Sequence, residues 1–199
     1  MDKRTIVYGD AGRYQASLRS LQKTDLSERN KKLVTDFATD LRRDGIGFKR
    51  VAKYVYHLKF IGKWLGKDFD KVDREDIMRI VDLLDSNGYT VNTIYDYKIA
   101  IKKFYKHLYK VDKDPFKLKT PSKKQRTKLP KPEELYTEEE IKAMTQKAGS
   151  IRNSAIIITL YESGARASEF LTMQFKDIEF DDNGARIRLT GKTGERNVR

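Results

Sequence analysis

Cysteine is absent from all 199 residues of the chain. Its absence excludes disulfide bonds, thiolate nucleophiles and cysteine-ligated zinc sites. Long apolar runs are lacking too, and no stretch resembles a signal peptide or a membrane-spanning helix. We therefore expect a cytoplasmic protein that does not bind membranes.

Acidic residues are scarce relative to basic ones. The chain has 42 Lys and Arg against 29 Asp and Glu, which gives a formal net charge of +13. The basic residues are spread along the whole chain, and a globular protein gains little from so much like charge unless a polyanion neutralises it. Nucleic acid is the partner class that this composition indicates, and a surface that serves only solubility is the alternative.

Proline is rare, and all four prolines fall between residues 115 and 132. Because proline blocks regular helix, we predict an extended linker over residues 113–135 that joins two small domains. The same stretch is strongly basic. Between Pro115 and Pro132 its cations are Lys117, Lys119, Lys123, Lys124, Arg126, Lys128 and Lys131. We expect Lys123, Lys124 and Arg126 to contact a DNA backbone, and a linker that is only solvated is the alternative.

A helical domain is predicted over residues 26–112. Apolar residues at helical spacing indicate helices over residues 27–45, 48–65, 73–87 and 91–109, bounded by Gly45, Asp73 and Asn87-Gly88. In the last of these, Ile94, Ile101 and Leu108 belong to a core stripe. Residues 1–25 are polar with weak periodicity, and they are assigned only as an N-terminal extension.

Basic side chains occupy other faces of the second and fourth predicted helices. We expect them to contact DNA phosphates or a groove, and a solvated helix face is the alternative. The residues are Lys49, Lys53 and Lys63 on the second helix and Tyr95, Lys98, Lys102 and Lys106 on the fourth.

The last predicted domain covers residues 136–199. Thr137 and Glu140 form a capping box that opens one helix, and the apolar residues 156–160 predict a second, largely buried helix that leads to Gly164. A further helix begins almost at once. Arg166 and Glu169 share a face of it, so the carboxylate can hold the guanidinium as part of an anion clamp. An exposed Arg-Glu pair without function is the alternative.

Two motifs follow one another here, Ser163-Gly-Ala-Arg-Ala-Ser-Glu-Phe170 and Gly191-Lys-Thr-Gly-Glu-Arg196, separated by a predicted turn at 181–184 and an alternating strand at 185–190. In this order they resemble the tyrosine recombinase (phage integrase) family, and residues 90–108 resemble the last helix of that family's core-binding domain. The resemblance implies a mainly α fold. It consists of a four-helix, SAM-like core-binding bundle followed by a partial α+β catalytic domain with a small antiparallel sheet.

The chemistry that this resemblance implies is attack by a tyrosine on a DNA phosphodiester, which leaves a 3'-phosphotyrosine and a free 5'-hydroxyl. Arg166 would bind the phosphate, Glu169 would support it, and Lys192 would protonate the leaving oxygen. No metal and no cofactor are required. The implied partners are double-stranded DNA and further copies of the full-length protein, as a dimer or tetramer on DNA.

The sequence departs from the family after the second motif. The family's nucleophile, second arginine and its histidine partner lie beyond that motif, whereas all eleven tyrosines here precede Arg166 and both histidines, His57 and His107, lie in the first domain. We expect the full-length protein to be a site-specific recombinase, and this truncated chain to bind DNA without cleaving it. The alternatives are a non-enzymatic DNA-binding protein that occupies recombination sites and a general nucleic-acid-coating protein. A type IB topoisomerase shares the chemistry, but the core-binding resemblance argues against it.

Overall fold

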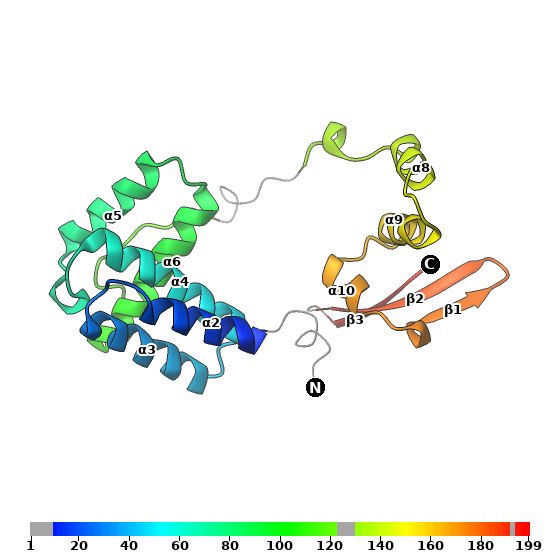
Figure 1. The fold of residues 1–199 in the computed structure, drawn as a ribbon. Coiled ribbons are helices and arrows are strands. Elements are labelled where there is room, and N and C mark those ends of the chain that lie inside the picture. Colours follow the sequence, from blue (N-terminus) through cyan, green and yellow to red (C-terminus); the bar gives the residue numbers. More distant parts are fainter. Residues whose placement is uncertain (1–9, 123–129, 192–193) are drawn as a thin grey trace. The chain divides into compact units, whose positions relative to one another are not determined.

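The computed structural model describes residues 10–122, 130–191 and 194–199, and the chain divides into two compact units (Figure 1). The N-terminal unit ends at residue 128 and is a helical bundle; the C-terminal unit begins at residue 129 and combines helices with a sheet. The predicted mainly α fold with a small antiparallel sheet is confirmed. Within the described ranges, no helix combines the length and the apolar character that a membrane span needs.

Among its described residues, the N-terminal unit contains the four helices that the sequence predicted and one more. The additional helix covers residues to which the sequence assigned no element, and it packs against α4 with Tyr14 and Leu21 buried. A short 3-10 turn, Phe69–Lys71, precedes α5. The helices are α2 (Asp10–Gln22), α3 (Glu28–Arg43), α4 (Phe48–Leu65), α5 (Arg74–Ser86) and α6 (Val91–Tyr109).

Side-chain caps explain where α3 and α5 begin. The Ser27 hydroxyl accepts a hydrogen bond from the Asn30 backbone N–H at 3.2 Å, which satisfies a donor that has no partner within α3. Asp73 and Asp76 form a reciprocal capping box at the start of α5. At the other end, Gly66 adopts the left-handed conformation with φ of 64° and ends α4.

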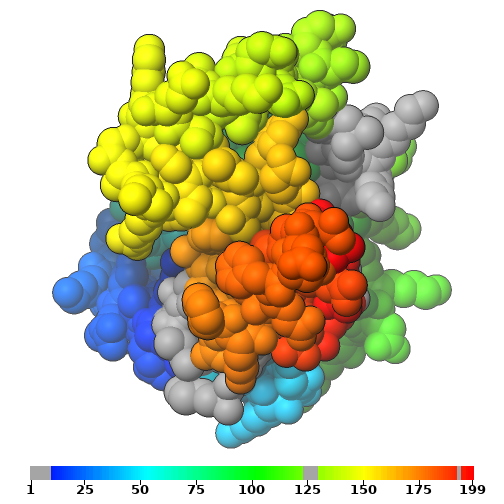
Figure 2. All heavy atoms as spheres, turned by 90° about the vertical axis from the view of Figure 1, so that its right-hand side faces the viewer, coloured from blue at the N-terminus to red at the C-terminus, as the bar shows by residue number. Residues whose placement is uncertain are grey.

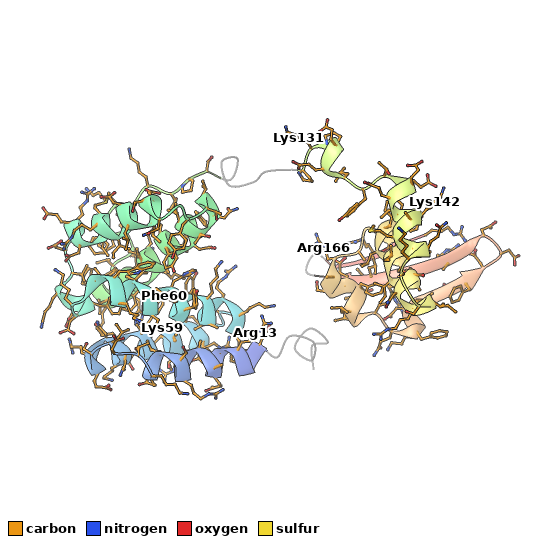
Figure 3. All side chains as sticks on the ribbon, turned by 45° about the horizontal axis from the view of Figure 1, so that its top comes forward. Arg13, Lys59, Phe60, Lys131, Lys142 and Arg166 are labelled. Carbon is orange, nitrogen blue, oxygen red and sulfur yellow. The ribbon has the colours of Figure 1, made fainter. Side chains whose placement is uncertain are left out.

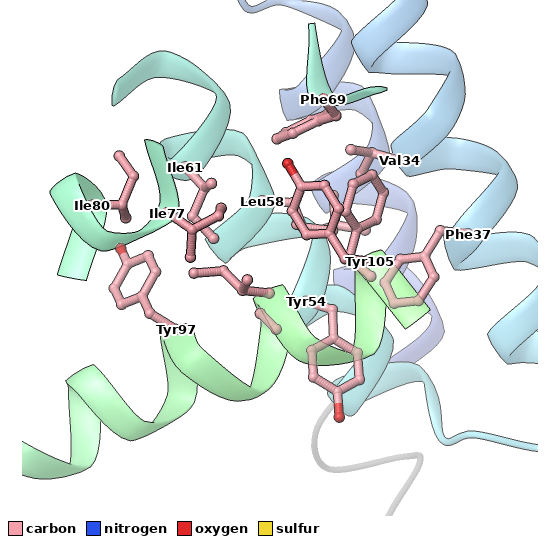
Figure 4. Close-up of a cluster of buried hydrophobic side chains, with 14 of the residues drawn as sticks. Val34, Phe37, Tyr54, Leu58, Ile61, Phe69, Ile77, Ile80, Tyr97 and Tyr105 are labelled. Atoms are coloured by element: carbon pink, nitrogen blue, oxygen red, sulfur yellow. The ribbon is translucent and has the colours of Figure 1, made fainter. Parts of the chain in front are cut away.

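One continuous hydrophobic core holds the bundle together. Figure 4 shows side chains from α3, α4, α5 and α6 meeting in it, among them Phe37, Leu58, Ile77 and Tyr105. Aromatic rings pack edge to face, with ring centroids 5.4 Å apart for Phe37 and Phe104. The predicted core stripe on α6 is confirmed at Ile101, which is fully buried.

The C-terminal unit has three short α-helices and a three-stranded sheet among its described residues. The capping box of Thr137 and Glu140 is present at the start of α8. The antiparallel sheet has the order β1-β2-β3, and Ile187 of β2 pairs with Ile178 on one side and Val198 on the other. The elements are α8 (Glu138–Gln146), α9 (Ile151–Ser163), α10 (Ala167–Thr172), β1 (Ile178–Asp181), β2 (Gly184–Gly191) and β3 (Gly194–Val198), with 3-10 turns at Pro132–Glu134 and Phe175–Asp177.

Residues 156–160 form the predicted helix, but the prediction that this helix is largely buried is wrong. The helix is present as α9, but Ile158 is 45% exposed and Tyr161 44%. The reason is that α9 packs mainly against α8, so its remaining faces stay uncovered by the described residues. Figure 2 shows the surface of this unit, with α8 and α9 in yellow-green and yellow and the strands in orange and red.

Replacing Ile101 with alanine should destabilise the N-terminal unit by about 2–5 kcal/mol, because it removes three fully buried carbon atoms from a packed core. The neighbouring Lys103 on the same helix is exposed and provides the matched control. Lys103→Ala should change the free energy of unfolding by less than about 0.5 kcal/mol. Urea denaturation followed by circular dichroism measures both values, and equal effects would show that the faces of α6 are misassigned.

His57 should make the stability depend on pH. Burial, and secondarily the charge of Lys53, lowers the pKa of His57 to about 4. The unfolded chain therefore takes up this proton near pH 6.5, before the folded chain does, so stability present above pH 6.5 is lost as the pH falls toward 4.

The loss should reach at most about 3 kcal/mol at pH 4. His57→Phe should abolish this part of the pH dependence, since neither ring nitrogen has a hydrogen-bond partner among the described residues and the ring packs 4.2 Å from that of Tyr97. Urea denaturation of both proteins between pH 4 and 7 measures the difference. Parallel curves would contradict the prediction.

Candidate functional site

A tight turn between α9 and α10 places Arg166. Gly164 ends α9 in the left-handed conformation, with φ of 55°, and its N–H donates to the Leu160 carbonyl at 3.1 Å. Ala165 N–H donates to the Ser163 hydroxyl at 3.2 Å, and α10 then starts at Ala167. Arg166 is thus the residue immediately before α10, where Figure 3 shows its side chain.

Glu169 is the buried partner of Arg166. The Arg166 Nη1 atom lies 2.6 Å from Glu169 Oε1, and the Arg166 backbone N–H donates to Oε2 at 3.1 Å. The Glu169 side chain is only 1% exposed, whereas that of Arg166 is 58% exposed. The pair that the sequence predicted is therefore present, and it fixes one edge of the guanidinium while the rest faces outward.

The charge of Glu169 is stabilised in this position. Hydrogen bonds from the Arg166 backbone N–H and then from its side chain lower the pKa of Glu169, and the charge of Arg196 adds to them against the opposing effect of burial. The carboxylate stays ionised at neutral pH, so it continues to bind Arg166 as a charge-assisted partner.

A second guanidinium, which the sequence did not single out, reaches the same carboxylate. Arg196 on β3 places Nη2 3.0 Å from Glu169 Oε2 and Nη1 3.4 Å from Oε1. The same Nη2 also donates to the Gly164 carbonyl at 3.2 Å. Arg196 ends the second sequence motif, so the signal was present, but only the fold shows that it meets Glu169.

Gly191 at the end of β2 also lies against this carboxylate. A Cβ atom added there would overlap Oε1 of Glu169 and stand 2.9 Å from its Cδ atom. The strand can approach α10 this closely only because the residue is glycine. The first glycine of the second motif therefore has a packing reason.

Lys192, the predicted general acid, lies outside the described residues, as do Lys123, Lys124 and Arg126 of the linker. Among the residues that are described, no group of three or more histidine and carboxylate side chains could hold a metal ion.

The six helix lysines of the N-terminal unit that the sequence predicted to contact DNA fall into two groups. Three are in ion pairs with aspartates of the same unit: Lys53 with Asp96 at 2.6 Å, Lys102 with Asp114 at 3.5 Å, and Lys49 with Asp10 at 3.6 Å.

The second group is Lys63, Lys98 and Lys106, which make no ion pair within the described part of the chain. Lys98 and Lys106 lie on one stripe of α6, on either side of Lys102. Tyr95, one turn before Lys98, is half-buried near the start of the same helix.

Comparison with known proteins identifies similar chains. Residues 134–199 match the model of the phage integrase family. Tyrosine recombinase XerA of Pyrococcus horikoshii is 28% identical over 171 residues, which cover 85% of this chain and 55% of that protein. Tyrosine recombinase XerC of Pediococcus pentosaceus is 33% identical over 151 residues, 66% of this chain and 47% of that protein.

The fold has a solved counterpart too. The XerH site-specific recombinase bound to difH substrate, in a pre-cleavage complex, matches 98% of this chain and 63% of its own with a TM-score of 0.57 at 16% identity. The chain spans about half the length of the curated relatives it matches. Residues 134–199 thus match the phage integrase family model, and the curated relatives are tyrosine recombinases. The chain is similar to proteins of the tyrosine recombinase (phage integrase) family.

Proposed function

We propose that this chain is the DNA-binding unit and the first part of the catalytic unit of a site-specific DNA recombinase. The longer protein cleaves and rejoins DNA through a 3'-phosphotyrosine, and these 199 residues bind double-stranded DNA without cleaving it. The observation that carries the proposal is the exposed Arg166 guanidinium held by the buried Glu169. The names of the relatives, which are tyrosine recombinases, support the same reaction class.

Arg166 suits a phosphodiester that gains negative charge. As the phosphorus becomes five-coordinate, charge grows on the non-bridging oxygens, and a planar guanidinium can bind two of them at once. Glu169 already binds Nη1 of this guanidinium, which limits its rotation, while the Arg166 side chain stays 58% exposed. The favourable geometry is thus prepared before DNA arrives. Lys192 remains the predicted proton donor for the leaving oxygen.

The N-terminal unit supplies the DNA-binding surface in this proposal. Lys98 and Lys106 make no ion pair in the described part of the chain, so no carboxylate of that part competes with a DNA phosphate for them. Lys53 and Lys102 would have to exchange an aspartate for a phosphate. We therefore expect the unpaired lysines of α6 to contribute more to binding than the paired ones. The full-length protein acts as a dimer or tetramer on DNA.

Replacing Lys98 and Lys106 together with alanine should weaken binding to duplex DNA by about tenfold or more, because two phosphate contacts are lost. The slope of log affinity against log salt should become shallower by about 2. Fluorescence anisotropy with a labelled duplex between 50 and 300 mM salt is the measurement.

The matched control is the pair Lys32→Ala and Lys71→Ala, which removes the same charge from the same unit. Both control lysines are exposed and pair with nearby aspartates, Lys32 with Asp36 and Lys71 with Asp68. This control should leave the slope nearly unchanged. If the two double variants lose affinity equally, α6 is no DNA-binding surface and only net charge matters.

Replacing Arg166 with alanine in the longer protein should lower DNA cleavage by about 100-fold or more while DNA binding stays nearly intact, because the residue stabilises charge that develops in the transition state. A suicide substrate and a denaturing gel report the covalent protein-DNA adduct. Lys142→Ala, which removes an exposed α8 lysine paired with Glu138, is the control with normal cleavage.

The 199-residue chain itself should bind the same substrate and form no adduct. An adduct from it would mean that one of its eleven tyrosines is a nucleophile. If the longer wild-type protein binds its site but never cleaves it, the protein is instead a DNA-binding protein that occupies such sites.

A further inference from the structure

We propose that Arg196 is a positioning residue, which holds Glu169 and through it Arg166 in the orientation that phosphate binding requires. This inference rests on the function proposed above. It concerns a side chain that is 38% exposed and that binds the Glu169 carboxylate of α10 and the Gly164 carbonyl at the end of α9.

The hydrogen bonds of Glu169 are the first argument. Its two carboxylate oxygens accept four hydrogen bonds or ion-pair contacts: Oε1 from Nη1 of Arg166 and Nη1 of Arg196, and Oε2 from the Arg166 backbone N–H and Nη2 of Arg196. A carboxylate has about four acceptor sites, so Glu169 is fully satisfied. A buried network in which every group has a partner is rigid, whereas removal of one partner leaves a costly unpaired group.

The geometry of Arg196 is the second argument. Its two terminal nitrogens face the two carboxylate oxygens in a fork, which fixes the plane of the carboxylate as well as its position. Nη2 also binds the carbonyl of Gly164, the residue that ends α9. One side chain of β3 therefore connects the end of α9 with the buried carboxylate of α10.

The close approach of β2 is the third argument. Gly191 leaves no room for Glu169 to move toward the sheet, because even a Cβ atom there would overlap its carboxylate. The close approach of the strand and the two contacts of the Arg196 fork together restrict the orientation of the carboxylate. Arg166 takes its own orientation from that carboxylate through the 2.6 Å contact of Nη1.

The test uses Arg196→Met, which keeps an unbranched apolar stem and removes the guanidinium with its charge and donors. In the 199-residue chain, NMR should show two changes. The Arg166 guanidinium signals should indicate faster rotation, and the carboxyl carbon of Glu169 should titrate at a higher pH. Arg166 and Arg196 are the charged groups within ion-pair distance of Glu169 in the described ranges, so loss of Arg196 leaves burial opposed by Arg166 alone.

In the longer recombinase, Arg196→Met should lower the single-turnover cleavage rate at saturating DNA by about 10- to 100-fold, the usual range for removing a partner that orients a functional group. The dissociation constant for DNA should stay within about twofold of the wild type. The variant should also lose activity at a higher pH than the wild type, because a protonated Glu169 no longer holds Arg166. Arg196→Lys, which keeps the charge without the fork, should have a cleavage rate between those of the wild type and Arg196→Met. It replaces Arg196→Met in the test if the methionine variant does not fold.

Arg199→Met is the matched control. It removes a guanidinium that pairs with Asp181 and is not in contact with Glu169, so the NMR signals and the cleavage rate should not change. Unchanged Arg166 and Glu169 signals in Arg196→Met, or a defect confined to DNA affinity, would overturn the proposal. If the longer wild-type protein does not cleave DNA at all, the proposed function is wrong, while the signals of Arg166 and Glu169 still decide whether Arg196 positions them.

Discussion

The C-terminal unit depends on the interactions that neutralise the buried carboxylate of Glu169. A charge that is 1% exposed is stable only when cations and N–H donors surround it, and here two guanidiniums and a backbone amide do so. These partners come from the turn before α10 and from β3. Neutralisation of one buried charge therefore links α10 to the strand β3. The same requirement presents two cations at the surface of this unit.

The N-terminal unit is held together by different forces. Its core is almost entirely apolar, and α2 to α6 all contribute to it. Hydrogen bonds occur at the edges of this core. The buried Asn30 side chain, for example, donates to the Lys67 carbonyl at 3.0 Å and accepts from the Phe69 N–H at 2.8 Å. That amide joins the start of α3 to the loop before α5. Helix orientation in this unit thus follows from packing, with a few polar contacts that set the connections.

The sequence was most informative where a local rule applies. Caps such as Asp73 and Thr137, and the end of α9 at Gly164, could be predicted because they depend on a few neighbouring residues. The Arg166 and Glu169 pair could be predicted for the same reason. The contact of Arg196 with Glu169 could not, since it joins residues 27 positions apart that meet only after the sheet has formed. The exposure of α9 was also beyond local rules, because an apolar pattern does not tell which element will cover it.

The ion pair between Lys53 on α4 and Asp96 on α6 has a consequence for the electrostatics of the bundle. A lysine whose charge is already compensated by an aspartate adds little to the potential that an approaching polyanion meets. If it does move to a phosphate, it leaves Asp96 uncompensated beside the same negative backbone, and repulsion offsets part of the gain. The formal net charge of +13 already counts each aspartate against a lysine, so it is the number of lysines at this surface that overstates the attraction. The distribution of the aspartates among the lysines governs the attraction between this surface and a polyanion.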